Sequence, residues 1–562
     1  MSLTIVSGLF DHMVLQRNRA NRSEAGITGK TQAQGPVLAT VLEMGKKLKG
    51  FDRRRIGDAA RGRFSAVLKG VPVGGPYDIE LTVAGESVLV SDVLVGDVWL
   101  LGGQSNMQGC GFLTRPRLPV DDNVRAFYMD DRWAPAADPI HNLWACVDQV
   151  HITLCGNMRP ARPASDWGAC PGPSFGLEMQ RLTGVPQGLI ACAHGGTSMD
   201  QWDPARRKLG SDSLYGALVR RLVKNGRRVA GMLWYQGCSD ANAACAPLYT
   251  RRMQRLCAAV RRDCRDPELP IAIVQIGRVI GWGEDAAVHW NSIQDQQRRL
   301  PDVIRNLLAV PVVDLPLDDN IHISGESQTI LGQRLAGAIQ TLRKAPKAPP
   351  APITVGKVST KLERNRTVIT ATFDNVVGRL CAGSRPSGFA VVMSGGADNH
   401  HDVQLNGRQA LIYSNHPEDE IAGAELYYGH GTNPYCNITD EAGRPLPVFG
   451  PVAIGTPRAI TPFIRTLRVS AFQPGAGKLH DLPFPADPGS LGFETRSFTT
   501  NFCDLHLDIA KLQDDSLVYY ACRFNCPSSM QLALLLGYDG PVKAWLDGRE
   551  IAHDPDGINP AV

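Results

Sequence analysis

Residues 98–107 read VWLLGGQSNM, and this stretch decides how the central region of the chain folds. The apolar run Val98–Leu101 predicts a buried strand. Gly102 and Gly103 permit a tight turn, and Ser105 then falls where a helix or helical turn begins. In that position its N–H and those of its neighbours can donate hydrogen bonds to a negatively charged oxygen. An ordinary helix N-cap is the alternative interpretation of Ser105.

Further strand-like and helical segments alternate along residues 96–345. Apolar runs follow at 188–193, 229–235, 270–276 and 308–313. Helical patterns lie at 174–184, 212–225, 248–263, 287–299 and 327–343. Alternation of continuous apolar strands with helices predicts a parallel sheet covered by helices on both faces.

Three more polar turns follow strands of this sheet. They contain residues 194–202 (HGGTSMDQW), 234–240 (WYQGCSD) and 318–324 (DDNIHIS). Ligands bind at the carboxyl ends of the strands in open α/β sheets, so we expect the four turns to form one site. Gly195 and Gly196 can expose a backbone donor, Gln236 can offer its amide, and Trp202 can present an apolar wall to a sugar. The alternatives are that the Gly195–Gly196 turn is a plain loop, that Gln236 is merely exposed at a strand end, and that Trp202 is simply packed.

Asp319 and His322 lie three residues apart in the last turn. On a turn, this spacing lets the carboxylate accept from imidazole Nδ1, which leaves Nε2 free to take a proton from a serine hydroxyl. Such a base is what a serine needs to attack a carbonyl. Asp318 is the alternative orienting acid, and a surface histidine near an aspartate is also common.

The regions on either side of the α/β segment are rich in short alternating runs and predict β structure. We predict four domains: an N-terminal β-sandwich at 1–95, the α/β domain at 96–345, a β domain at 353–455 and a C-terminal β module at 456–562. A Pro-rich linker at 345–352 separates the second from the third.

Composition excludes several classes of protein. The chain has 562 residues, of which 59 are basic and 55 acidic, so the net charge of +4 does not indicate nucleic acid as a partner. The sequence contains no run of 18 apolar residues, so no membrane span is expected. The N-terminus lacks the pattern of a signal peptide, so either the protein is not secreted or its leader is absent from this chain. The 14 cysteines form no CxxC pair and do not settle the compartment.

Taken together, the four turns resemble the conserved blocks of the SGNH hydrolases, and within them the sialate O-acetylesterase-like carbohydrate esterases. The matching blocks are GGQSNM at 102–107, GGT at 195–197 with Trp202, WYQG at 234–237 and DNIH at 319–322. Flanking phrases at 9–17, 74–77 and 96–99 match as well, so the similarity covers residues from about 8 to about 450.

This resemblance implies a three-layer α/β/α core with a parallel sheet, flanked by β-sandwich domains, and a serine esterase that removes O-acetyl groups from carbohydrates. It implies Ser105 as nucleophile, His322 as general acid and base, and Asp319 as the residue that orients His322. The oxyanion donors would be Ser105 N–H, Gly195 or Gly196 N–H and the Gln236 amide. We expect substrate contacts from the turns at Gln104, Asn106, Asp200, Trp202, Cys238 and Asp240.

No metal or cofactor is implied, and the expected partner is an acetylated carbohydrate. The resemblance also suggests a secreted or periplasmic protein, whereas the oligomeric state stays open. One departure concerns Cys238, because the family usually has glutamate after the glycine at this position, which puts the choice of sugar and full activity in question. The sequence at 540–548, near the C-terminus, looks like part of a jelly-roll accessory module.

Two other hypotheses stay open at this point. A glycan-binding protein with an impaired active site would fit the β modules and Cys238. A lipase or thioesterase on the same core would be expected to carry exposed apolar lid segments, which the sequence does not show.

Overall fold

The structure is a computed structural model that describes residues 3–156, 166–363, 366–393, 398–416, 421–454, 464–475, 479, 481–498, 503, 516–526, 528–529, 534, 536–538 and 540–558. The chain divides into two compact units. The first comprises residues 1–391, 400–420 and 425–455, and the second comprises 392–399, 421–424 and 456–562.

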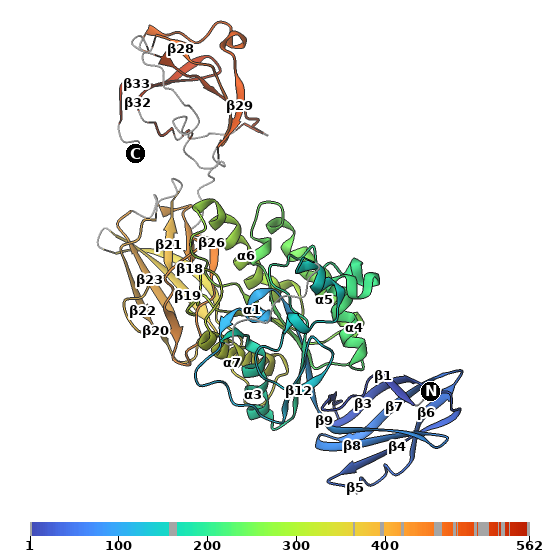
Figure 1. The fold of residues 1–562 in the computed structure, drawn as a ribbon. Coiled ribbons are helices and arrows are strands. Elements are labelled where there is room, and N and C mark those ends of the chain that lie inside the picture. The colour runs from blue at the N-terminus through green and yellow to red at the C-terminus, as the bar shows by residue number, and fades with distance from the viewer. Residues whose placement is uncertain are drawn as a thin grey trace. The chain divides into compact units, whose positions relative to one another are not determined.

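A parallel sheet lies at the centre of the first unit (Figure 1). Its strands are β11 (Val124–Phe127), β14 (Gln187–Ala191), β9 (Glu86–Gly103), β15 (Gly231–Tyr235), β16 (Ile271–Gln275) and β17 (Leu307–Pro311), in that spatial order. The short strand β12 (Trp133–Pro135) pairs antiparallel with β11. The first polar turn follows β9, which lies between β14 and β15, so three of the four turns are neighbours.

Five helices occupy the segments where periodicity predicts them. They are α3 (Pro171–Thr183), α4 (Leu214–Lys224), α5 (Tyr249–Cys264), α6 (Glu284–Val303) and α7 (Gly325–Leu342). Trp99 of β9 packs edge-on against Phe175 of α3, with ring centroids 5.1 Å apart. A Cβ atom on Gly102 would instead lie 3.7 Å from Leu218 of α4. Because residues an odd number apart on a strand face opposite sides, helices cover both faces of the sheet.

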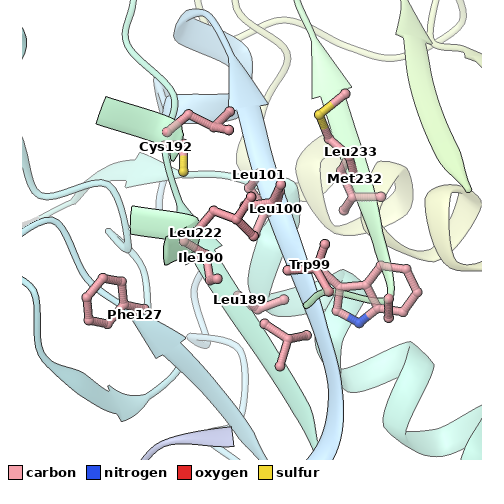
Figure 2. Packing of buried hydrophobic residues seen from close by; sticks show 14 of the residues in the cluster. Trp99, Leu100, Leu101, Phe127, Leu189, Ile190, Cys192, Leu222, Met232 and Leu233 are labelled. Carbon is pink, nitrogen blue, oxygen red and sulfur yellow. The ribbon is translucent and has the colours of Figure 1, made fainter. Parts of the chain in front are cut away.

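Figure 2 shows how tightly the central strands are packed. Leu100 and Leu101 on β9, Ile190 on β14 and Met232 and Leu233 on β15 are all fully buried. Burial on both faces explains why these strands read as continuous apolar runs rather than alternating ones.

The N-terminal residues form antiparallel strands that continue directly into this sheet. The order is β1 (Thr4–Ser7), β3 (Arg22–Lys30), β7 (Arg63–Pro72), β6 (Arg54–Ala60), β4 (Gly35–Glu43), β8 (Gly74–Val83) and β9. The 18-residue strand β9 belongs to both parts, since it pairs with β8 through residues 86–95 and with β14 and β15 through residues 97–103. The boundary predicted between residues 95 and 96 thus lies inside one strand.

A second β region packs against the α/β core. One sheet contains β18 (Thr354–Glu363), β19 (Arg366–Asp374), β23 (Gln409–Ser414) and β22 (Asp402–Asn406). Another contains β21 (Phe389–Val392), β24 (Glu425–Tyr428) and β26 (Phe449–Ala453), and β26 contacts α6 (Figure 1). Gln275, the last residue of β16, exchanges hydrogen bonds with the backbone of Val448 at 2.8 and 2.9 Å.

The second unit contains small antiparallel sheets. They are built from β27 (Thr466–Val469), β29 (Glu494–Ser497) and β31 (Tyr520–Ala521), from β28 (Gln473–Pro474) and β30 (Ser516–Leu517), and from β32 (Gly540–Leu546) and β33 (Arg549–Ile558). The mixed sheet with helices and the additional β-sheets therefore agree with the predicted fold class, while the four-domain layout and the jelly-roll assignment stay predictions.

No helix in the described ranges is long and apolar enough to cross a membrane. In the part of the chain that the structure describes, no disulfide joins any of the cysteines.

Candidate active site

Ser105 is the first residue of the short helix α1 (Ser105–Gln108), directly after β9. The turn between them depends on Gly103, whose φ is 130°. A Cβ atom at Gly103 would lie 2.1 Å from the carbonyl oxygen of Tyr235 on the neighbouring strand. Only glycine permits this approach, and it places Ser105 at the carboxyl edge of the sheet.

The backbone donors at the start of α1 suit a negatively charged oxygen. Met107 and Gln108 N–H donate to Gln104 O at 2.9 Å each, whereas Ser105 N–H lies too early in the helix for such a bond. The Ser105 residue is 9% exposed. The position fits the predicted oxyanion role of Ser105 N–H.

Gly195 lies against Ser105, since a Cβ atom on Gly195 would lie 3.4 Å from Ser105 Cβ. Its N–H, however, donates to Gln108 Oε1 at 2.6 Å. This corrects the expectation that Gly195 N–H is available to an oxyanion. Gly196 is exposed at the same turn with φ 68°, and it is the member of the glycine pair that fits the predicted role.

Gln236 also differs from its expected role. The residue is fully buried, and its Nε2 donates to Thr197 O at 3.1 Å and to Asp240 Oδ2 at 2.6 Å. Its Oε1 is buried without a hydrogen-bond partner among the described residues. Because its N–H groups already have acceptors, Gln236 joins the second and third turns instead of presenting a donor to substrate.

The Asp319–His322 pair has the predicted geometry. Asp319 Oδ2 lies 2.6 Å from His322 Nδ1, and Asp319 Oδ1 accepts from the N–H groups of Ile321 and His322 at 2.8 and 2.7 Å. Burial alone would raise the pKa of Asp319, but these hydrogen bonds hold it below its ordinary value. An ionised carboxylate cannot donate, so Nδ1 of a neutral His322 carries the proton and Nε2 is the basic nitrogen.

Asp318 has other partners. Its Oδ2 accepts from Phe112 N–H at 2.6 Å and from Gly325 N–H at 3.1 Å. These bonds hold the end of the loop at the start of α7, so Asp319 and not Asp318 is the partner of His322.

Asn106 fastens the Ser105 turn to the loop that carries Asp319 and His322. Its Oδ1 accepts from Ile323 N–H at 3.0 Å, and its Nδ2 donates to Ile321 O at 3.3 Å. The residue is 1% exposed. These bonds bring segments more than 200 residues apart together, and they give Asn106 a positioning role where we expected a substrate contact.

Most of the other expected substrate contacts point into the protein. Gln104 Oε1 accepts from Gly237 N–H at 3.0 Å, and Trp202 is fully buried with its Nε1 donating to Thr197 Oγ1 at 3.0 Å. Asp240 is also fully buried and accepts from Met199 N–H at 2.8 Å. Burial of Cys238 raises the pKa of its thiol to about 12. The placement of these four side chains argues against direct sugar contact.

Asp200 is the expected contact that faces solvent. It lines a surface hollow of about 190 Å³ together with Asp203, Arg251, Arg252 and Arg255. Arg206 and Arg252 pair with its carboxylate at 2.9 and 3.7 Å. Asp200 therefore stays a candidate contact, although its carboxylate already has partners.

Buried histidines behind the second turn are a feature that the sequence argument missed. His151 Nδ1 lies 2.9 Å from His194 Nδ1, and the rings stack with centroids 5.1 Å apart. Burial lowers the pKa of His194 to about 4, so the ring is neutral at neutral pH. The backbone N–H of His194 donates to Gly103 O at 3.1 Å, which ties the second turn to the first beside Ser105. A histidine directly before the Gly–Gly turn was the only signal in the sequence.

Across the described ranges, no group of three or more His, Cys, Asp or Glu side chains is arranged to hold a metal ion.

The α/β region of the chain is similar to known proteins. Residues 95–341 match the family model described as a carbohydrate esterase, sialic acid-specific acetylesterase. A probable carbohydrate esterase of Arabidopsis thaliana is 27% identical over 270 residues, which cover 44% of this chain and 92% of that protein. The human sialate O-acetylesterase is 29% identical over 202 residues, which cover 31% of this chain and only 38% of that enzyme.

A solved structure shares the fold over a longer stretch. The crystal structure of a carbohydrate acetylesterase from Xanthomonas citri superposes with a TM-score of 0.61 at 22% identity, covering 80% of this chain and 99% of that one. The family match, the relatives and the arrangement of turns at one sheet edge agree. Over residues 95–341 the chain is similar to the carbohydrate esterases of the sialic acid-specific acetylesterase family, and these matches identify the protein as an esterase.

Proposed function

We propose that the protein removes O-acetyl groups from carbohydrates through an acetyl-enzyme on Ser105. The observation that carries the proposal is the Asp319–His322 pair, with 2.6 Å between Oδ2 and Nδ1, tied by Asn106 to the turn of Ser105. Asp319 fixes the tautomer of His322 in which Nε2 is basic, as a serine esterase requires.

In the proposed reaction, His322 Nε2 takes the proton of Ser105 as the hydroxyl oxygen attacks the acetyl carbonyl. The carbonyl oxygen becomes negatively charged and accepts hydrogen bonds from Ser105 N–H and Gly196 N–H. When the tetrahedral intermediate collapses, the C–O bond to the sugar breaks, and His322 gives its proton to the sugar oxygen. The products of this step are the free sugar hydroxyl and acetyl-Ser105.

Water then removes the acetyl group by the same steps in reverse. His322 takes a proton from water as its oxygen attacks the acetyl carbonyl, and it returns that proton to Ser105 as acetate leaves. Gly195 N–H and the Gln236 amide contribute indirectly in this scheme, because Gln108, Thr197 and Asp240 already accept their hydrogen bonds.

The substrate is proposed only as an acetylated carbohydrate. Cys238 stands where the resemblance leads us to expect glutamate, and this buried thiol is a difference that bears on the choice among acetylated sugars.

Acetate release tests the proposal. We compare the wild type with Ser105→Ala and with Ser65→Ala, which replaces an exposed serine on β7. The substrates are acetylated xylan, mannan, pectin and O-acetyl sialic acids. We expect the wild type and Ser65→Ala to release acetate from at least one substrate, and Ser105→Ala to release none above buffer. Equal release by Ser105→Ala would overturn the assignment, and glycan binding without release by the wild type would favour an impaired esterase.

A further inference from the structure

An exposed tryptophan lies on the loop that joins β16 to α6, close to the loop of the Asp319–His322 pair. Trp282 is 40% exposed and Ile280, two residues earlier, is 41% exposed. Ile280 N–H donates to Asn320 O at 2.8 Å, and Asn320 adjoins Asp319. This bond joins the Trp282 loop to the loop that carries Asp319 and His322.

The segment Gly429–Tyr435 of the second β region borders this loop and holds it. Val279 N–H donates to Thr432 O at 2.7 Å, and Thr432 Oγ1 donates to Trp282 O at 3.2 Å. Arg278 Nη1 donates to Asn433 Oδ1 at 2.8 Å. The backbone at Trp282 and just before it is therefore held by hydrogen bonds from another part of the fold.

That segment is anchored in turn to helix α6. Asn291 Nδ2 donates to the carbonyl oxygens of Gly429 and Gly431 at 3.1 Å each, and Asn291 Oδ1 accepts from Gly431 N–H at 2.8 Å. Asn291 is 8% exposed, so these bonds are shielded from water.

The indole of Trp282 is supported from one side. It packs edge-on against Trp290 of α6, with centroids 5.4 Å apart and an interplanar angle of 73°. Trp290 is 1% exposed, and its Nε1 donates to Gly277 O at 2.9 Å. A fixed but exposed ring is unusual for packing alone, because burial is what a tryptophan contributes to stability, whereas it is typical of a binding surface.

We propose that Trp282 forms a platform for a pyranose ring of the carbohydrate chain, next to the residue whose acetyl group is removed. The C–H face of a pyranose is apolar and stacks on an aromatic ring. Asn320 and Asn433 are both exposed and both bonded to the Trp282 loop, Asn320 O by Ile280 N–H and Asn433 Oδ1 by Arg278. Their side-chain amides can donate to the ring hydroxyls. The inference rests on the proposed function and extends it, since it assigns binding to sugars beyond the acetylated one.

The test compares Trp282→Ala, Trp282→Phe and Val288→Ala on an O-acetylated xylo-oligosaccharide and on p-nitrophenyl acetate. Val288 is 70% exposed on α6 and serves as the matched control. For Trp282→Ala we expect kcat/KM on the oligosaccharide to fall about tenfold more than on the small ester, which corresponds to roughly 1.4 kcal/mol of binding. Trp282→Phe should keep most of the activity, because it retains a ring, and Val288→Ala should not separate the two substrates.

Equal losses on both substrates in Trp282→Ala would overturn the platform and indicate that Trp282 supports the loop through Trp290. Unchanged kcat/KM on both would overturn it as well. If the wild type releases no acetate at all, the proposed function fails, and calorimetric titration with unacetylated xylohexaose, mannohexaose and hexagalacturonate tests the platform separately. Weaker binding to Trp282→Ala than to the wild type would support the platform, and no binding of any of the three hexamers by the wild type would contradict it.

Discussion

Asp318 and Asp319 are neighbours in the chain with different tasks. Asp318 accepts from Phe112 and Gly325 N–H and holds a loop end, whereas Asp319 accepts from His322 Nδ1. The pair gives an internal control, because the same change from Asp to Asn at either position removes one carboxylate from the same loop.

We predict that Asp319→Asn lowers kcat by about 10²–10⁴-fold, because an amide no longer fixes the tautomer of His322. Asp318→Asn should lower kcat much less, since its remaining carbonyl oxygen can still accept the two N–H groups. Initial rates with p-nitrophenyl acetate measure both. Equal losses in the two variants would contradict the assignment of Asp319.

The pH dependence follows from the direction of the Asp319 shift. Its pKa lies below the ordinary value of about 4, so the carboxylate stays ionised as pH falls, until the pH passes through the lowered pKa. Titration of Asp319 should therefore add no step of its own to the pH profile of wild-type kcat/KM between about pH 5 and 8. A titration of the Asp319 carboxyl carbon with its midpoint in this range, followed by NMR on the wild type, would contradict the prediction.

Residue types and spacing suggested a base and its orienting acid in His322 and Asp319, but Ser105 alone is equally typical of a helix N-cap. The expected roles of the three residues came from the combination of the four turns with the family resemblance, and they stay predictions. Residue types and spacing were not enough to predict which side chains point into the protein and which face solvent. Trp202 and Asp240 belong to types that often bind sugars, yet both are fully buried. Whether a polar turn residue faces solvent depends on neighbours from distant segments, such as Thr197 beside Trp202, which a single sequence does not specify.

At the scale of elements, the passage from β9 to α1 depends on a glycine. Gly103 has φ 130° and sits against the carbonyl of Tyr235, whereas Gly35 has φ 126° with nothing within 4 Å of a Cβ atom. A side chain at either position would strain the backbone, because φ is positive at both. Only at Gly103 would its Cβ atom also clash with the carbonyl oxygen of Tyr235.

We predict that Gly103→Ala lowers the free energy of unfolding by at least about 2 kcal/mol more than Gly35→Ala, because strand β15 must move away from β9. Gly103→Ala should also lose esterase activity. Urea unfolding followed by tryptophan fluorescence measures the difference. Indistinguishable stabilities would show that the turn relaxes without moving Tyr235.

The helices of the core were predictable to within a few residues, since their apolar periodicity is strong. The course of the chain at the boundary between residues 95 and 96 was not predictable in this way, because a strand shared by two β regions has no turn residues at the point where its partners change. Glu86–Gly103 continues without interruption from the N-terminal sheet into the parallel one.

At the scale of the whole molecule, Asp97 joins three distant parts of the first unit. Its carboxylate accepts from Arg17 at 2.8 and 2.9 Å, in the N-terminal region, and from Arg343 at 2.8 Å, directly after α7. Burial alone would raise the pKa of Asp97, but the two guanidinium groups hold it below the ordinary value.

We predict that Asp97→Asn destabilises the protein by about 3–5 kcal/mol at neutral pH, since it leaves two partly buried cations without their counter-charge. A lowered pKa contributes stability above the ordinary pKa of aspartate, and this stability is lost as pH falls through the lowered value. The variant should therefore show weaker acid dependence of unfolding below about pH 4. Asp58→Asn, which breaks an exposed pair with Arg55, is the control; an equal effect at both positions would contradict the role of Asp97.

The proposed reaction as a whole depends on Ser105 being the nucleophile. Treatment with a fluorophosphonate, followed by digestion and mass spectrometry, tests this most directly, because the reagent bonds covalently to an activated serine. We expect one adduct, on the peptide that contains Ser105, with labelling at least about 100-fold slower in His322→Ala and absent in Ser105→Ala. An adduct on another serine, or acetate release by a protein whose Ser105 stays unlabelled, would contradict the account.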